Sequence, residues 1–190
     1  MAEGRSVVAP DTRRETEPQG GSESQQGRDA RHGADLPHQG SADGRYVLRP
    51  PACAGDWASY HTIRQDVLLE AREFSLDHPP EEEERAPLHH PMLLWCDDRP
   101  IGTIRIDRLE GDRAAFRLVA IDPPAQGRGH GRRLLGCAER FAREIGCRTI
   151  VVYATPEAAG FYARSGYVED VWDESCVGGI VQMMKPLAEG

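Results

Sequence analysis

The pattern of apolar and polar residues changes at about residue 45. Before this point, Val7, Val8 and Leu36 are the only branched aliphatic residues, and there is no aromatic residue. Such a segment cannot bury enough apolar surface to offset the entropy that the chain loses on ordering. We therefore predict a disordered low-complexity tail over residues 1–44 and a single folded domain over residues 45–190.

The first part of the domain predicts a strand, a helix and a loop. Residues 46–49 form a short, largely apolar run that ends at two prolines. Apolar residues then recur at three- and four-residue spacing from Trp57 to Phe74, which predicts an amphipathic helix with Asp56 as its N-cap. Residues 77–91 hold five acidic residues and four prolines and are predicted to form a solvated loop.

The second part predicts a sheet and two further helices. Three apolar runs joined by short turns are typical of an antiparallel meander. An amphipathic helix that ends at Gly146, a continuously apolar strand and a second helix with Thr155 as its N-cap follow, and two short strands end the chain. The predicted segments are the strands 92–96, 101–109 and 114–121, the helix 134–145, the strand 149–153, the helix 155–164 and the strands 167–171 and 180–184.

Charge and composition narrow the functional classes. The formal net charge of −8 argues against a general nucleic-acid-binding protein, which usually presents a basic face. No apolar run is long enough to span a membrane, and the N-terminus lacks the apolar core of a signal peptide, so we expect a cytoplasmic protein. The five cysteines form no C-x-x-C pair. The neighbours His89 and His90 would point to opposite sides of an extended segment, so we predict no metal site.

A glycine-rich turn between a strand and a helix carries the clearest chemistry. It lies between Val119 and Leu134 and contains Gly127, Gly129 and Gly131, together with three arginines. Glycines let a backbone approach a ligand closely, and the first N–H groups of a helix can bind an anion such as phosphate. The turn lacks the Lys-Ser/Thr of a P-loop, and it does not match the G-x-G-x-x-G of a dinucleotide site.

Two segments together resemble one known family. Gln126, Gly129 and Gly131 form a Q-x-x-G-x-G pattern, which resembles the acetyl-coenzyme A pyrophosphate motif of the GCN5-related N-acetyltransferase (GNAT) family. About thirty residues later, a segment that begins at Thr155 is similar to the family's N-x-x-A-x-x-F-Y-x-x-x-G-F segment, with Thr in the place of the usual Asn. The matching positions of this segment are Ala158, Phe161, Tyr162, Gly166 and Tyr167.

The resemblance implies an α/β fold with a mixed central β-sheet flanked by helices, and acetyl-CoA as cosubstrate without a metal. It also implies that strand 114–121 separates from strand 149–153 and that the pantetheine arm of acetyl-CoA pairs with the first of them. By the same resemblance, Tyr162 is the catalytic acid that protonates the leaving thiolate. The implied cofactor-binding residues are Leu118, Val119, Ala120, Gln126, Gly127, Arg128, Gly129, His130, Gly131, Arg132 and Thr155.

From these observations we expect an N-acetyltransferase that transfers an acetyl group directly to an amine within a ternary complex. A non-catalytic acyl-CoA-binding regulatory module and a scaffolding protein remain alternatives. The acceptor stays open between a small amine, an amino acid, an antibiotic and a protein amine, and so does the oligomeric state. Cys176 is disfavoured as a covalent nucleophile because no histidine lies near it in the sequence. Candidates for the general base are Asp107, Glu110, Asp122, Glu174 and a chain of water molecules.

Overall fold

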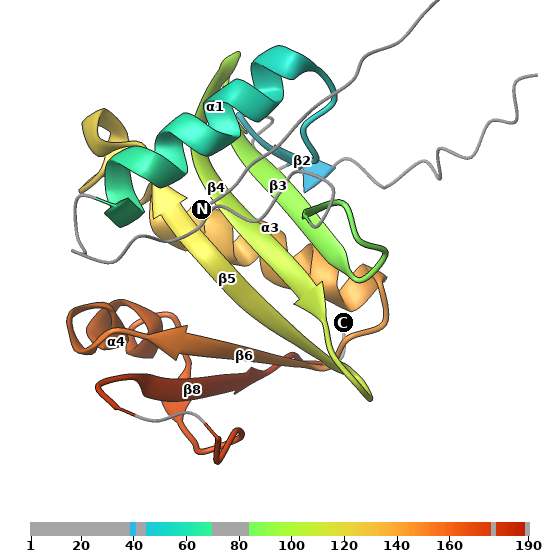
Figure 1. The fold of residues 1–190 in the computed structure, drawn as a ribbon, viewed down its shortest axis with the longest axis vertical. Helices are drawn as coiled ribbons and strands as arrows, with labels where there is room; N and C mark the ends of the chain where they lie inside the picture. The colour runs from blue at the N-terminus through green and yellow to red at the C-terminus, as the bar shows by residue number, and fades with distance from the viewer. Residues whose placement is uncertain (1–38, 41–44, 70–83, 176–177, 189–190) are drawn as a thin grey trace, which may run out of the picture. The chain divides into compact units, whose positions relative to one another are not determined.

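The computed structural model describes residues 39–40, 45–69, 84–175 and 178–188. These residues form one sheet with helices on both of its faces (Figure 1). The predicted disordered tail lies outside the described residues except for Gln39 and Gly40, which pair with a neighbouring strand. Its disorder therefore stays a prediction.

Within the described residues the sheet contains eight strands in the order β1-β2-β3-β4-β5-β6-β8-β7. Of these strands, β5 and β6 are parallel to each other, and the other neighbouring pairs are antiparallel. The predicted meander is confirmed as β3, β4 and β5. The strands are β1 (Gln39–Gly40), β2 (Tyr46–Arg49), β3 (His89–Cys96), β4 (Arg99–Arg108), β5 (Arg113–Ile121), β6 (Thr149–Ala154), β7 (Val168–Glu169) and β8 (Val181–Pro186).

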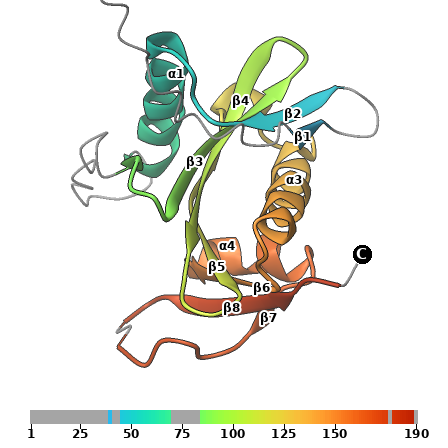
Figure 2. The ribbon, with the colours of Figure 1, turned by 90° about the vertical axis from the view of Figure 1, so that its right-hand side faces the viewer.

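Helices cover both faces of the sheet. Figure 2 shows α1 (Ala54–Arg64) on one face and α3 (His130–Glu144) on the other. Helix α3 forms the crossover that a parallel β5–β6 pair requires. Helix α4 (Pro156–Ala163) follows β6, and a 3-10 turn (Pro123–Ala125) precedes α3. Within the described residues, no helix is long and apolar enough to cross a membrane.

The main hydrophobic core lies between the sheet and α3. Leu134, Ala138 and Phe141 recur at helical spacing on α3 and pack in one cluster with Ile104 and Ile106 of β4. All five are fully buried, and each of the larger side chains contributes about 1.5–3 kcal/mol to stability by leaving water. A smaller cluster under α1 consists of Trp57, Tyr60, Ile63, Leu93 and Ala120.

The start of α1 differs from the prediction. Asp56 is not the N-cap, because the helix begins at Ala54 with Cys53 as its cap residue. The carboxylate of Asp56 instead accepts a hydrogen bond from the backbone N–H of Ala52 (2.9 Å) and pairs with Arg49 of β2. The tertiary partner thus decides where this carboxylate lies. The α-helix ends at Arg64 and continues as a π-helical turn, Gln65–Leu69, and the rest of the predicted helix lies outside the described residues.

The end of the predicted acidic loop is also corrected. Residues 89–91 belong to β3, where they pair with β4. His90 packs on Phe141 of α3 with ring centroids 5.3 Å apart, whereas His89 lies opposite Asp107 on the other face of the sheet. Glu84, which was predicted to be solvated, is fully buried. More of this segment is therefore buried or paired in the sheet than its composition indicated.

Candidate functional site

Strands β5 and β6 are paired over only four residues. The register joins Arg113–Phe116 to Thr149–Val152 and ends there, and Figure 1 shows the two strands separating beyond this point. Just past the last pair, Leu118 has a φ of 54°, and two residues of β5 stand opposite one residue of β4. This is a β-bulge, which bends a strand and increases its twist. We attribute the separation of β5 from β6 to this bulge.

The turn after β5 is fixed by polar contacts at its base. The backbone N–H of Asp122 donates to the carbonyl of Ile101 (2.9 Å), and the side-chain amide of Gln126 donates to the carbonyl of Ile121 (2.9 Å). The carboxylate of Asp122 also pairs with Arg99 at 2.7 Å. These contacts hold the loop backbone in one conformation ahead of α3.

Glycines at three positions of the turn serve two different purposes. Gly127 and Gly129 have φ values of 73° and 83°, and Gly129 is the N-cap of α3. An added Cβ at either position would meet no atom within 4 Å, so their requirement is conformational. At Gly131 an added Cβ would lie 3.1 Å from the ring of Phe161. Gly131 therefore allows α3 and α4 to pack closely.

A cleft of about 1230 Å³ extends from the separated strands across this turn and between α3 and α4. Val119 and Ala120 line its strand end, and residues 126–132 line its middle. The first N–H groups of α3 have no partner within the helix and carry its positive dipole end. Among the described residues, the lining of the cleft contains no acidic residue and five arginines, although the net charge of the chain is −8. The arginines are Arg128, Arg132, Arg133, Arg140 and Arg164. This combination favours the binding of an anion such as a diphosphate.

Two of the predicted cofactor-binding residues do not line the cleft. Leu118 lies in the bulge, where its carbonyl accepts a hydrogen bond from the hydroxyl of Thr103 (3.4 Å). Thr155 is the N-cap of α4, and its hydroxyl accepts from the backbone N–H of Ala158 (3.3 Å). The predicted capping role of Thr155 is thus confirmed. The other nine predicted cofactor-binding residues all contribute to the lining.

Tyr162 lies on α4, outside the lining of the cleft. Its ring packs against Phe161 and Tyr167, with centroids 5.1 Å and 5.5 Å apart, and 7% of the residue is exposed. Burial raises the pKa of Tyr162 to about 12, so the phenol keeps its proton at neutral pH. The hydroxyl of Tyr167 donates to Glu139 (3.2 Å). That of Tyr162 has no hydrogen-bond partner among the described residues.

His130 connects the turn to β2. Its Nδ1 lies 2.9 Å from the hydroxyl of Tyr46. Burial lowers the pKa of His130, and the charges of Arg45 and Arg128 lower it further. The imidazole is therefore neutral at neutral pH, and it braces the first turn of α3 against the sheet.

Sequence reasoning missed several residues of the cleft. Arg132, Gly136 and Arg140 recur every four residues on α3, so helical periodicity could have identified the last two. No local signal points to the others, because tertiary packing brings them to the turn. The lining residues beyond those predicted are Tyr46, Val67, Ile121, Ala125, Arg133, Gly136, Cys137, Arg140, Ala158, Phe161, Arg164 and Ser165.

A buried charged cluster lies on the opposite face of the sheet, under α1. The carboxylate of Glu84 accepts a hydrogen bond from the hydroxyl of Tyr60 (3.1 Å) and pairs with Arg64 (2.7 Å). Arg105 of β4 lies 3.6 Å from the same carboxylate. A buried charge is tolerated only when it is paired and hydrogen-bonded, and Glu84 meets both conditions.

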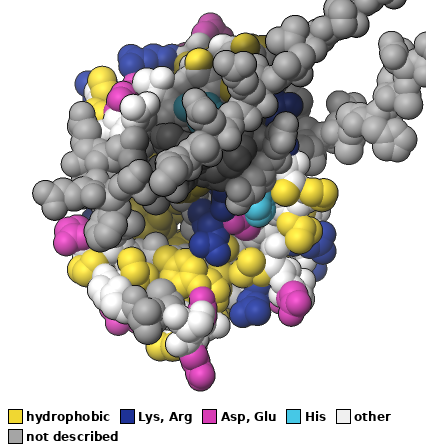
Figure 3. All heavy atoms as spheres, viewed as in Figure 1, with side chains coloured by type: hydrophobic (Ala, Val, Ile, Leu, Met, Phe, Trp, Pro, Cys, Tyr) yellow, Lys and Arg dark blue, Asp and Glu magenta, His cyan; other side chains and the backbone are white. Residues whose placement is uncertain are grey.

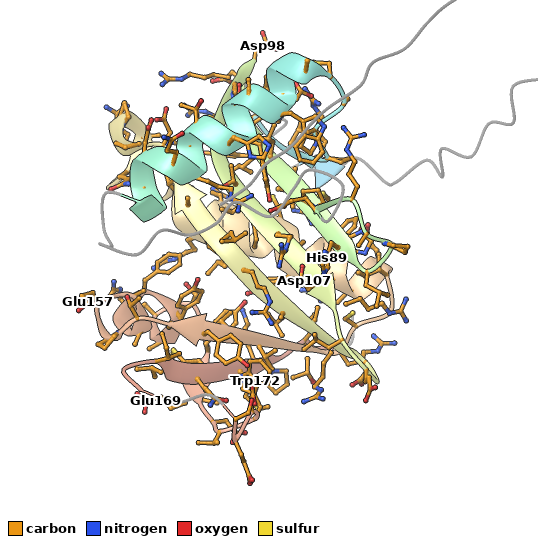
Figure 4. All side chains as sticks on the ribbon, in the orientation of Figure 1. His89, Asp98, Asp107, Glu157, Glu169 and Trp172 are labelled. Atoms are coloured by element: carbon orange, nitrogen blue, oxygen red, sulfur yellow. The ribbon has the colours of Figure 1, made fainter. Side chains whose placement is uncertain are left out.

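This cluster continues to β5 through Asp107. The carboxylate of Asp107 pairs with Arg105 at 2.8 Å and with Arg117 at 2.9 Å. Figure 4 shows Asp107 beside His89 over the middle of the sheet, and Figure 3 shows basic side chains on this face beside a histidine and an acidic side chain.

The structure singles out no general base among the predicted candidates. Asp107 and Asp122 are held in ion pairs with arginines, and Glu110 and Glu174 are exposed. Cys176 lies outside the described residues. Among the described residues, no group of three or more His, Cys, Asp or Glu side chains is placed to hold a metal ion.

Comparisons with known proteins agree on one family. The model of the acetyltransferase (GNAT) family matches residues 57–167. Glucosamine 6-phosphate N-acetyltransferase 1 of Oryza sativa subsp. japonica is 43% identical over 51 residues, which are 27% of this chain and 31% of that protein. Serotonin N-acetyltransferase 2 (chloroplastic) of the same organism is 30% identical over 97 residues, 47% of this chain and 48% of that protein. The chain thus spans between about a third and a half of these relatives.

Solved structures agree on the fold. N-acetylglutamate synthase from Neisseria gonorrhoeae, complexed with coenzyme A and N-acetyl-glutamate, matches with a TM-score of 0.62 and 20% identity. The match covers 76% of this chain and 35% of that one. At this level of identity, the likeness supports the arrangement of strands and helices alone.

Proposed function

This chain belongs to the acetyltransferase (GNAT) family, and from that premise we propose that it is an acetyl-CoA-dependent acyltransferase, which transfers the acetyl group to an amine by direct attack in a ternary complex. The observation that carries the proposal is the continuous cleft between the separated strands and the N-terminus of α3. It offers an extended strand edge at one end and an anion site at the other, as a pantetheine arm and a diphosphate require.

The residues of the cleft fit acetyl-CoA in chemical type. The diphosphate would bind the backbone N–H groups of residues 126–132, beside Arg128 and Arg132. Val119 and Ala120 would contact the pantetheine arm next to the bulge. Acetyl-CoA supplies an activated acyl group as a thioester.

Transfer to an amine needs a neutral nucleophile, stabilisation of the developing oxyanion and a proton for the leaving thiolate. We assign stabilisation of the leaving thiolate to Tyr162, which keeps its proton at neutral pH and has no competing hydrogen-bond partner among the described residues. Because its pKa exceeds the ordinary thiol value of about 8.5, Tyr162 would act as a hydrogen-bond donor to the departing sulfur, and the thiolate would take its proton from water. Thr155 would act indirectly, by capping α4 and so fixing the position of Tyr162.

Calorimetric titration tests the proposal at its first step. We expect acetyl-CoA to bind with a stoichiometry near one per chain. We also expect bound coenzyme A to stabilise the protein by about 2.7 kcal/mol at 100 times its Kd. No detectable heat and no thermal shift at millimolar acetyl-CoA would overturn the proposal.

Thiol release with a panel of amines tests the second step. We expect release of coenzyme A in proportion to the amount of acetylated amine, measured by mass spectrometry on the same samples. Binding of acetyl-CoA without thiol release from any amine would instead favour the non-catalytic acyl-CoA-binding alternative.

A further inference from the structure

Arg117 occupies a special position on β5. It is the first residue after the last β5–β6 pair, and it precedes the bulge at Leu118. Its neighbour Phe116 packs in the core on the α3 side, so strand alternation places Arg117 on the opposite face. There its guanidinium lies over the ring of Tyr153 of β6, 5.3 Å from the centroid. Arg117 thus bridges the two strands where they begin to separate, on the face away from the anion-binding turn.

The carboxylates around Arg117 are already occupied by donors. Asp107 accepts two hydrogen bonds from Arg105, of 2.8 Å and 3.0 Å, besides its ion pair with Arg117. Asp173 accepts from the hydroxyl of Tyr153 and from the backbone and hydroxyl of Ser175. Hydrogen bonds from Ser175 and Tyr153 lower the pKa of Asp173, and the charge of Arg117 adds to this effect. Asp107 is thus paired with two arginines, and the carboxylate of Asp173 is held by hydrogen bonds within its own loop and from Tyr153.

Donors, by contrast, remain available on this face. A guanidinium carries five N–H donors, and within the described residues only the Nε of Arg117 is matched with a carboxylate. The side chain of Arg117 is 36% exposed, against 12% for Arg105 and 3% for Arg64. The indole of Trp172 packs at a tilt on Tyr153 with centroids 4.5 Å apart, and its N–H is buried, so it is Arg117 that offers accessible donors to a ligand. Figure 4 shows Trp172 on this same face.

A half-exposed guanidinium with spare terminal donors favours a ligand group that only accepts hydrogen bonds. Carboxylate and phosphate are such groups, and arginine binds both with two parallel hydrogen bonds. We infer that the acceptor amine carries an anionic group, a carboxylate or a phosphate, which binds the terminal N–H groups of Arg117 while the amine reaches the separation of β5 and β6. This inference rests on the proposed function and specifies its substrate class. It makes Arg117 a residue that determines specificity and argues against polyamines as acceptors.

Matched pairs of amines test this inference on the wild-type protein. One pair is glucosamine 6-phosphate and glucosamine, and another is L-phenylalanine and L-phenylalaninamide, with spermidine as a cationic probe. We expect kcat/KM, measured by thiol release, to be at least about tenfold higher for the anionic member of one pair. The first pair reports a phosphate as the anchor, and the second reports a carboxylate.

Variants of two arginines of β5 test whether Arg117 causes the preference for anionic amines. Arg117→Gln should lower kcat/KM for the preferred anionic amine by roughly 100-fold, mainly through KM. It should leave kcat/KM for the partner that lacks the anionic group within about threefold. Arg117→Lys keeps the positive charge but loses the planar guanidinium with its parallel N–H donors, so it should retain part of the preference. Arg113→Gln is the matched control, because Arg113 lies at the paired end of β5 and should keep the full preference. Calorimetry with acetyl-CoA on each variant reports whether it is folded.

Several results would overturn the inference. One is an equal or higher kcat/KM for spermidine or for the amines without an anionic group. The others are an undiminished preference in a folded Arg117→Gln protein, and failure of every anionic amine to be acetylated or bound while acetyl-CoA binds. In each of these cases the proposed acetyl transfer would stand, provided that some other amine is acetylated. Failure to bind acetyl-CoA, or thiol release from no amine at all, would remove both proposals together.

Discussion

Gly129→Val is expected to lower acetyl-CoA affinity at least about 100-fold, and no binding should be detectable at micromolar ligand. Gly129 has a φ of 83°, a conformation that costs a residue with a Cβ about 1–2 kcal/mol and is rarer still for a β-branched one. The glycine lines the cleft, and an added Cβ would meet no atom within 4 Å. The valine side chain would therefore occupy space beside the first N–H groups of α3. Isothermal titration calorimetry measures the effect.

Gly111→Val is the matched control for this substitution. Gly111 has a φ of 74°, and an added Cβ there would also meet no atom within 4 Å, but the residue lies in the turn between β4 and β5 and not in the cleft. Both variants should lose a similar amount of stability, about 1–3 kcal/mol, in chemical denaturation. Only Gly129→Val should lose acetyl-CoA binding. Unchanged affinity in folded Gly129→Val would mean that the phosphates bind elsewhere.

Tyr162→Phe is expected to lower kcat by roughly 10²–10³-fold, the usual loss when one hydrogen-bond donor to a developing negative charge is removed. The substitution keeps the ring that packs between Phe161 and Tyr167 and removes only the hydroxyl. Because that hydroxyl would act mainly in the transition state, acetyl-CoA affinity should stay within a few-fold. Initial rates with an accepted amine, under conditions where chemistry limits turnover, measure the effect. Equal rates for the two proteins would refute the assignment of Tyr162.

Tyr167→Phe separates catalysis from packing in the same aromatic cluster. Tyr167 is buried, and its hydroxyl donates to Glu139, so its loss should cost about 1–3 kcal/mol of stability, as for a hydrogen bond to a charged group. Turnover should change by less than threefold. The pH profile provides a further check. Because burial raises the pKa of Tyr162 to about 12, the wild-type rate should show no loss from ionisation of this residue between pH 7 and pH 10.

Local rules predicted the segment from β5 to α4 well. Gly146 follows α3 with a φ of 88°, and Thr155 caps α4, as their sequence positions indicated. Both features depend on residues within one turn of each other, so the sequence contains the needed information. The same holds for Gly127 and Gly129, whose conformations depend on the turn itself.

Tertiary contacts decided the features that the sequence did not reveal. Glu84 is the last of four consecutive glutamates, and only its partners from α1 and β4 explain why it is buried. Cys53 is a poor capping residue by type, yet it starts α1 because the carboxylate of Asp56 pairs with β2. Pro91 has no backbone N–H to donate to a neighbouring strand, so its presence argued against a strand at this position. The strand β3 nevertheless includes it.

The short pairing between β5 and β6 has a consequence for the cooperativity of the fold. Four residue pairs join strands β1–β5 to strands β6–β8, whereas six pairs join β6 to β8. Cooperative opening units in proteins often follow such boundaries. In native-state hydrogen exchange, we expect the amides of β8 to exchange through a partial opening that leaves β3 and β4 protected. A ligand that contacts both sides of the separation would suppress this opening, so that the two groups of strands exchange as one unit.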